Sequence, residues 1–176
     1  MLRKNIKQHI ENYFFIYPNA KLRVREIERT LKIPLPSVIR YCKELMKEQI
    51  LTTNKVGNVV FYTADRSSQK YLREKKLYNI RTLYESGLIE YIKKELSNPG
   101  IVLFGSYSKG EDTEESDIDI YLETPSRKEL KLDKFKKVLN REINVLRHKN
   151  LKEVSNTHLA NNIVNGITLN KYIEVF

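Results

Sequence analysis

The chain of 176 residues contains, at positions 101–122, the segment IVLFGSYSKGEDTEESDIDIYL. Its first four residues, 101–104, form an apolar run that is typical of a buried strand. In its last six residues, 117–122, polar and apolar side chains alternate, which predicts a second strand with one face in a core. The segment therefore predicts two strands, joined by a Gly-Ser bend and an acidic loop.

The polar positions of this segment suit phosphate and metal chemistry. On a strand, side chains two residues apart share a face, roughly 6.6 Å apart along the chain, so Asp117 and Asp119 should converge. Two such carboxylates can bind one or two divalent cations, Mg²⁺ or Mn²⁺. Gly105 permits close approach of a phosphate, the Ser106 hydroxyl can hold it, and Lys109 can neutralise it. The competing interpretation is an acidic strand facing solvent, with Lys109 as a solvated loop residue.

This pattern resembles the DNA polymerase beta-like nucleotidyltransferase superfamily: a strand, Gly105-Ser106, ten residues, then Asp117-Ile118-Asp119 on the next strand. It is most similar to the small, minimal members from prokaryotes, and the resemblance extends from Ile101 through NNIVNGITL at 161–169. It implies a transferase that uses Mg²⁺ or Mn²⁺ and ATP or another nucleoside triphosphate. The acceptor would be a protein side chain or an RNA end. Some proteins of this type modify a partner toxin and act as its antitoxin, so a toxin partner is a further expectation.

The family carries a third carboxylate on a later strand, and this sequence departs from that pattern. Residues 142–146 predict the strand, with Ile143 and Val145 facing the core. By register, Asn144 falls where the family has aspartate, and an asparagine amide can ligate a metal but cannot accept a proton. Glu142, on the same face one pleat away, is the alternative. The sequence therefore predicts an enzyme whose turnover depends on Asn144 or Glu142 completing the catalytic set.

Residues 1–65 predict three helices followed by a β-hairpin. Apolar residues at helical spacing mark the helices, and residues 54–58 have turn chemistry between two strands. This layout resembles a winged helix-turn-helix domain, whose third helix enters the major groove of DNA. The candidate nucleic-acid contacts lie off the apolar stripe of the third helix and at the hairpin tip: Ser37, Arg40, Tyr41, Lys43, Lys47 and Lys55.

Positive charge is concentrated in the first half of the chain. Residues 1–75 carry +9 of the formal net charge of +10. This asymmetry favours a polyanionic partner, with DNA as the first expectation, although a solvated basic surface or a module for protein docking and dimerisation has the same composition. The competing function is therefore a DNA-binding transcriptional regulator, whose degenerate transferase domain binds only nucleotide or a partner protein.

The expected fold class is α+β. Residues 1–65 form the winged helix, residues 66–97 form a helical connector and the start of the transferase domain, and residues 98–176 form the nucleotidyltransferase domain with a short mixed sheet. The connector should break near Gly87.

Two further elements are expected in the transferase domain. Residues 129–140 predict a helix with a basic surface, and the apolar residues of 171–176 predict a final strand.

The remaining composition excludes several classes of protein. The single cysteine, Cys42, excludes an internal disulfide framework and a cysteine-rich zinc site. No apolar run approaches the roughly 20 residues that a membrane helix needs, and the N-terminal residues do not resemble a signal peptide. We therefore expect a cytoplasmic protein without membrane association, and the sequence is compatible with a homodimer.

Overall fold

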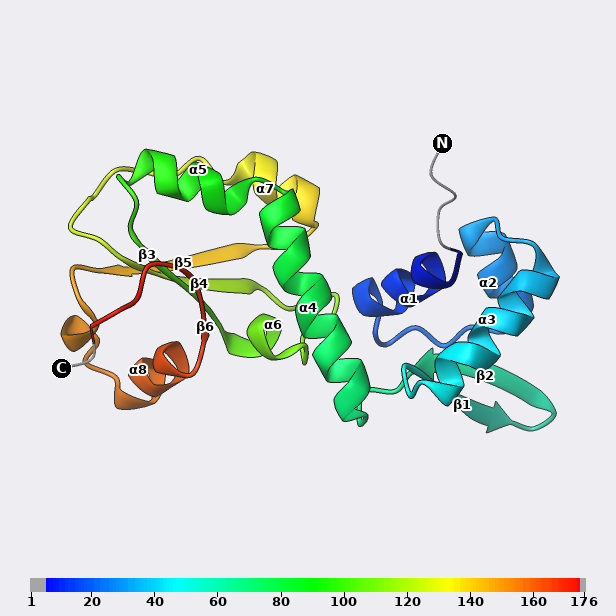
Figure 1. Cartoon of the computed structure of the whole chain (residues 1–176). Helices are drawn as coiled ribbons and strands as arrows, with labels where there is room; N and C mark the ends of the chain where they lie inside the picture. Colours follow the sequence, from blue (N-terminus) through cyan, green and yellow to red (C-terminus); the bar gives the residue numbers. More distant parts are fainter. Residues whose placement is uncertain (1–5, 175–176) are drawn as a thin grey trace. The chain divides into compact units, whose positions relative to one another are not determined.

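The chain divides into two compact units, Met1–Tyr78 and Asn79–Phe176. The computed structural model describes residues 6–174. The boundary falls inside helix α4 (Gln69–Glu85), within the segment 66–97 that was expected to connect two modules. Each unit combines helices with strands (Figure 1), so the expected α+β class is confirmed.

The N-terminal unit consists of three helices followed by a β-hairpin, in the order that the apolar periodicity predicts (Figure 1). Its elements are α1 (Ile6–Ile16), α2 (Val24–Leu31), α3 (Leu35–Lys47), β1 (Leu51–Val56) and β2 (Val59–Ala64). Along α3, Val38, Cys42 and Leu45 are completely buried and form one stripe. Pro36 suits the first turn of α3, because backbone N–H groups at that position have no partner within the helix.

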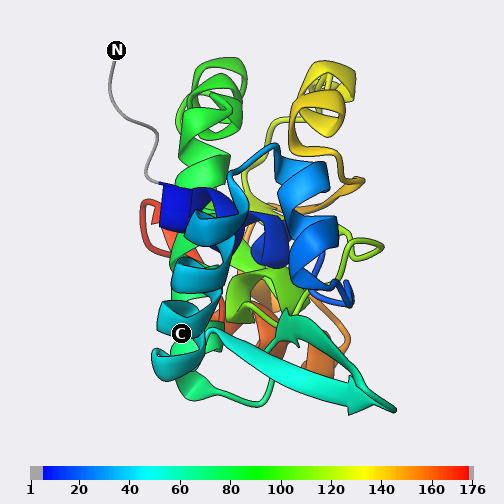
Figure 2. The same ribbon diagram turned by 90° about the vertical axis from the view of Figure 1, so that its right-hand side faces the viewer.

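The hairpin has a shorter turn than the sequence predicts. Val56 pairs with Val59, so only Gly57 and Asn58 remain between the strands, instead of the five residues 54–58. Two-residue turns are common in hairpins because their twist matches that of the flanking strands. Lys55 therefore lies on β1 rather than in the turn. Figure 2 shows the hairpin extending away from the helices of its own unit.

A backbone bridge ties the hairpin to the segment that precedes α2. The N–H of Leu22 donates to the carbonyl of Tyr62 at 3.0 Å, and the N–H of Tyr62 donates back at 2.8 Å. This reciprocal pair adds a third, very short strand position beside β2. The hairpin is thus anchored at its base, while its distal residues 52–60 are exposed.

Cys42 belongs to the core of the N-terminal unit. Its side chain is completely buried, and burial raises the pKa of the thiol to about 12. A thiol with so high a pKa is almost entirely protonated at neutral pH. Cys42 therefore packs as a small apolar side chain.

Tyr71 on α4 supplies a hydrogen bond that α1 cannot make for itself. The carbonyl of Phe14 would ordinarily accept from the N–H of residue 18, but that residue is proline and has none. The buried hydroxyl of Tyr71 donates to this carbonyl at 3.1 Å instead. We expect Tyr71→Phe to lower the free energy of unfolding by about 1 kcal/mol in urea denaturation.

Tyr17→Phe is the matched control for this substitution, because Tyr17 is 40% exposed. It should change the free energy of unfolding by less than about 0.5 kcal/mol. Equal effects of the two substitutions would contradict a stabilising role for the Tyr71 hydroxyl.

A mixed sheet forms the centre of the C-terminal unit (Figure 1). Its strands are β3 (Gly100–Phe104), β4 (Ile118–Glu123), β5 (Ile143–His148) and β6 (Ile167–Asn170), in the order β5-β4-β3-β6. Strand β3 is antiparallel to β4 and β6, whereas β4 and β5 are parallel. The register sets Asp119 between Phe104 of β3 and Asn144 of β5.

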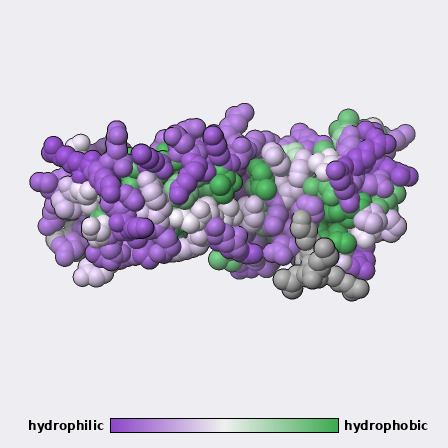
Figure 3. All heavy atoms as spheres, turned by 90° about the horizontal axis from the view of Figure 1, so that it is seen from above, coloured by the Kyte–Doolittle hydropathy of each residue, from purple (hydrophilic) through white to green (hydrophobic). Residues whose placement is uncertain are grey.

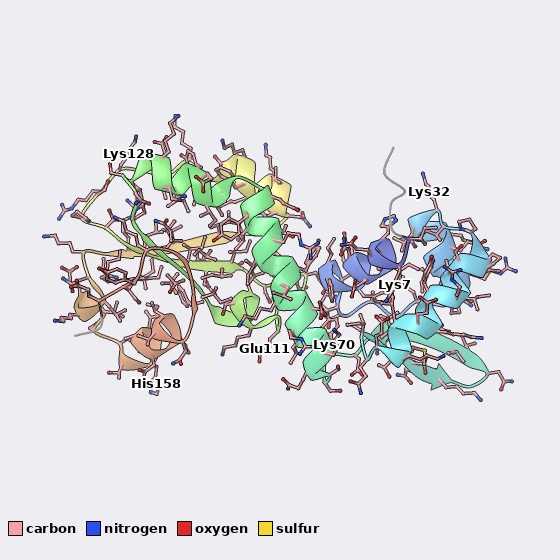
Figure 4. All side chains as sticks on the ribbon, in the orientation of Figure 1. Lys7, Lys32, Lys70, Glu111, Lys128 and His158 are labelled. Atoms are coloured by element: carbon pink, nitrogen blue, oxygen red, sulfur yellow. The ribbon has the colours of Figure 1, made fainter. Side chains whose placement is uncertain are left out.

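Helices cover both faces of this sheet (Figure 1). The last turns of α4, together with α5 (Leu88–Glu95) and α7 (Asp133–Leu139), pack on the face that carries Ile118 and Ile120. The opposite face carries Val102 and Tyr121 and packs against α8 (Thr157–Val164). Figure 4 shows Lys128 and His158 on opposite sides of the sheet. The expected break near Gly87 is confirmed, since it separates α4 from α5.

Two expected elements of the C-terminal unit have different bounds. Helix α7 spans 133–139 rather than 129–140, and the N–H of Lys131, before the helix, donates to the Tyr91 hydroxyl at 2.9 Å. Within the described residues the last strand is β6, and residues 171–174 are not a strand: Lys171 has a φ of 50°, which ends the extended run. Residues 175–176 of that prediction lie outside the described residues.

Exposed lysines lie on both α5 and α7, among them Lys94 and Lys137. On the face shown in Figure 3, this part of the C-terminal unit is mostly hydrophilic.

Within residues 6–174, every helix is too short or too polar to span a lipid bilayer.

Candidate active site

The junction of β3 with the short helix α6 (Gly105–Lys109) favours glycine. Gly105 has a φ of 73°, in the left-handed region that side chains disfavour. A Cβ atom at this position would overlap with Oδ2 of Asp119. The glycine therefore allows the chain to turn from strand to helix directly against a carboxylate.

Asp117 and Asp119 lie on the same side of β4. Asp117 immediately precedes the strand and Asp119 is its second residue, while Ile118 and Ile120 are completely buried on the other face. The period of two that predicts this division is thus present in the structure. Both aspartates are partly exposed, so solvent and small ligands have access to their carboxylates.

Asn144 on the neighbouring strand β5 contacts both carboxylates. Its side-chain Nδ2 donates to Oδ2 of Asp117 at 3.0 Å and to Oδ1 of Asp119 at 3.2 Å. The parallel register places Asn144 directly opposite Asp119. The position where the resemblance expects a third carboxylate therefore holds an amide that donates two hydrogen bonds to the aspartate pair.

Glu142, the alternative third acid, is engaged with a different partner. Its exposed carboxylate accepts from Nζ of Lys136 on α7 at 2.6 Å. This hydrogen bond is the main cause of the raised pKa of Lys136, and the negative charges of Glu142, Asp133 and Asp117 act in the same direction. The carbonyl of Glu142 accepts from the N–H of Ile118 at 2.9 Å, which begins the pairing of β4 with β5.

The two other expected phosphate contacts lie on α6. Ser106 follows Gly105 and is partly exposed, and Lys109 is exposed in the last residue of the helix. The neighbouring residues are structural: Tyr107 packs in the core, and the buried Ser108 hydroxyl donates to the carbonyl of Gly105 at 2.7 Å. Ser106 is therefore the α6 hydroxyl beside Gly105 that is open to a ligand.

A buried polar cluster that sequence reasoning did not identify holds the loop between α6 and β4. The Nδ2 group of Asn79 donates to the Tyr107 carbonyl at 2.9 Å and to Oδ1 of Asp112 at 2.8 Å. The guanidinium of Arg141 lies 3.5 Å from the other carboxylate oxygen of Asp112. These residues come from distant parts of the chain and form no sequence motif, and the run EDTEES around Asp112 indicated only an acidic loop.

The basic residues of α3 form a second candidate surface, in the N-terminal unit. Arg40, Lys43 and Lys47 are exposed and lie three and four residues apart, on the side opposite the buried stripe. The guanidinium of Arg40 lies 4.3 Å from the centroid of the Tyr41 ring, and its Nε is 3.6 Å from the Glu44 carboxylate. Ser37 is partly exposed in the first turn, and Lys55 is exposed on β1.

The acidic side chains of the site suit a cation that arrives with a nucleotide. Among residues 6–174, no group of three or more His, Cys, Asp or Glu side chains is arranged to hold a metal ion. Mg²⁺ does not need such a cage, because it is commonly bound by one or two carboxylates together with substrate phosphates and water. Asp117 and Asp119 provide two such carboxylates. Both accept from the Asn144 amide, and Asp119 also lies against Gly105.

Comparison with known proteins agrees with this geometry. No curated protein and no solved structure matches the chain. Residues 85–169 match the family model described as a nucleotidyltransferase domain, and the matched stretch contains Gly105, both aspartates and Asn144. This match supports membership of the nucleotidyltransferase superfamily for residues 85–169.

Proposed function

We propose that the C-terminal unit transfers a nucleotidyl group from a nucleoside triphosphate to an acceptor, in a reaction that depends on Mg²⁺ or Mn²⁺. One observation carries the proposal: Gly105, whose positive φ favours glycine, lies directly against Asp119, whose carboxylate shares the Asn144 amide with Asp117. A backbone open to phosphate beside paired carboxylates is the arrangement that phosphoryl-type transfer requires. ATP is the proposed donor, and a protein side chain or an RNA end is the proposed acceptor.

Each residue has a distinct task in this proposal. Asp117 and Asp119 hold the cation, which neutralises phosphate charge when bound. Gly105 admits the triphosphate to the backbone of β3 and α6, the Ser106 hydroxyl donates to a phosphate oxygen, and Lys109 approaches from the helix end. The acceptor oxygen bonds to the α-phosphorus while the bond to the β-phosphate breaks and pyrophosphate leaves. The acceptor proton passes to water, since an amide such as that of Asn144 is not a base.

ATP labelled at either the α- or the γ-phosphate tests this proposal. With Mg²⁺, α-label should become bound to RNA, to an added protein or to the chain itself, while γ-label should appear in pyrophosphate. Chelation with EDTA should stop both. Release of γ-label as inorganic phosphate would instead indicate an ATPase, and nucleotide binding without any transfer would favour a nucleotide-binding regulator over the enzyme.

Glu142→Gln distinguishes the two candidates for the third catalytic position. Because the Glu142 carboxylate is engaged with Lys136 and is exposed, we expect the substitution to change transfer by less than about tenfold, the range of a surface ion pair. The measurement is the initial rate of pyrophosphate release. A loss of a hundredfold or more, about the size expected on removing a general base, would show that Glu142 serves the reaction.

The N-terminal unit suggests a second function, binding of double-stranded nucleic acid, with DNA as the first candidate. The supporting observation is the exposed row of Arg40, Lys43 and Lys47, opposite the buried stripe of the third of three helices. In helix-turn-helix proteins such a helix enters the major groove, and lysine and arginine contact phosphates and guanine edges. The β1–β2 hairpin, which carries Lys55, would be the wing of a winged helix-turn-helix domain. It is anchored at its base by the bridge to Leu22.

Fluorescence anisotropy with labelled duplex DNA tests this second function. The triple variant Arg40→Ala/Lys43→Ala/Lys47→Ala should weaken binding at least about tenfold and reduce the dependence of affinity on salt, because phosphate contacts release counterions. The control Lys93→Ala/Lys94→Ala/Lys131→Ala removes the same charge from exposed or half-exposed residues of the other unit. Equal losses for both variants would contradict a specific α3 surface and favour general attraction. Absence of both DNA binding and nucleotide transfer would favour pairing with a partner protein, such as a toxin.

A further inference from the structure

We infer that Asn144 restricts the active site to a single divalent cation, which binds together with the nucleotide. This inference rests on the proposed transferase function and concerns the same site. It assigns Asn144 a positioning role: its amide occupies the side of the two carboxylates that does not face Gly105, and there it excludes a second cation.

The geometry of the aspartate pair separates two sides. The amide nitrogen of Asn144 is 3.0 Å from Oδ2 of Asp117 and 3.2 Å from Oδ1 of Asp119. The other oxygen of Asp119, Oδ2, faces Gly105 at the start of α6. One side of the pair is therefore occupied by an amide donor, and the other faces Gly105, where we propose that the triphosphate binds.

An N–H donor and a cation compete for the same carboxylate oxygens. A carboxylate oxygen that accepts a hydrogen bond from an N–H group is not available in that direction to a cation. The amide also carries its two hydrogens on the nitrogen that faces the aspartates, so it presents no lone pair there. An amide in this orientation donates to both carboxylates on the side away from Gly105.

The charges near the site also favour a single divalent cation. In two-metal sites, the ions lie about 3.5–4 Å apart and need several negative ligands to offset their repulsion. Here the set consists of Asp117 and Asp119, since Asn144 is neutral and the Glu142 charge is balanced by Lys136. The two carboxylates balance one dication. The phosphates of the nucleotide supply further negative charge only on the Gly105 side.

Electron paramagnetic resonance with Mn²⁺ tests this inference without any turnover. The full chain is titrated with Mn²⁺ at saturating α,β-methylene ATP, which cannot be cleaved between these phosphates. We expect a single bound Mn²⁺ per chain, with the spectrum of an isolated ion. Asn144→Asp, which restores the third carboxylate, should bind a pair of Mn²⁺ ions with the spectral broadening of closely spaced spins.

Asn140→Asp is the matched control, because it adds the same charge at an exposed residue just after α7. It should still bind a single ion, and circular dichroism checks that each variant is folded. A coupled pair of ions in the unsubstituted chain, or a single ion in a folded Asn144→Asp variant, would overturn the inference alone. Binding of neither Mn²⁺ nor the ATP analogue by the unsubstituted chain would overturn the proposed function as well.

Discussion

Gly105→Ala is expected to reduce nucleotidyl transfer by at least about a hundredfold and to destabilise the C-terminal unit by about 2–5 kcal/mol. Two effects combine. Alanine at a φ of 73° strains the backbone by about 1–2 kcal/mol. Its methyl group would also overlap with Oδ2 of Asp119, and relief of such a clash costs about 1–3 kcal/mol. Any relief moves either the aspartate or the backbone that we propose holds the triphosphate.

Gly87→Ala separates these two effects. Gly87 has a φ of 75°, close to that of Gly105, but nothing lies within 4 Å of a Cβ atom at this position. This variant should lose only about 1–2 kcal/mol of stability and retain transfer. Urea unfolding and the rate of pyrophosphate release measure the two quantities. Similar losses of transfer in both variants would refute a specific contact between residue 105 and Asp119.

Asp119→Asn is expected to lower transfer by about 10²–10³-fold, with little change in the free energy of unfolding. Removal of one carboxylate leaves Asp117 as the only anionic ligand and weakens charge neutralisation in the transition state. The fold should persist, because an asparagine oxygen at position 119 can still accept from the Asn144 amide. Initial rates across a range of Mg²⁺ concentrations should also show a higher requirement for the ion.

Asp133→Asn provides the control for charge alone. Asp133 is exposed at the start of α7, and its charge acts on Lys136, as that of Asp117 does. Its substitution should leave both the rate and the Mg²⁺ requirement unchanged. If Asp119→Asn transferred nucleotide as fast as the unsubstituted chain, the proposal of a metal-dependent transferase would be wrong.

Local patterns predict much of this fold. The order of helices and strands in the N-terminal unit follows from apolar spacing, as in α3, where Val38, Cys42 and Leu45 form the buried stripe. In the C-terminal unit the same spacing predicts β3, β4, α7 and β5, but not α6, α8 or β6. The bounds of α7 and of the final strand were predicted incorrectly, because they depend on contacts and backbone angles that the spacing of apolar residues does not reveal. The segment before α7 is held by a bond from Lys131 to the distant Tyr91 hydroxyl, and β6 ends where Lys171 adopts a positive φ.

The candidate site also has features that the sequence predicts and features that it does not. The convergence of Asp117 and Asp119 depends on the period of one strand, and the position of Asn144 depends on a register that the apolar neighbours Ile143 and Val145 fix. The ion pair between Glu142 and Lys136 could not be inferred from the sequence. Lys136 lies on α7, and the turn between α7 and β5 brings the two side chains together. The same holds for the Asp112–Arg141 pair, whose partners are separated by strand, helix and loop.

Burial of the single cysteine in the N-terminal unit provides an experimental handle. A reagent such as a thiol-specific dye can label Cys42 only when the three-helix core opens, because the thiol is inaccessible and protonated in the folded state. The C-terminal unit contains no cysteine, so labelling kinetics report on one unit while intrinsic fluorescence reports on both. The wild-type chain therefore allows the opening of its two halves to be timed separately, without an engineered probe.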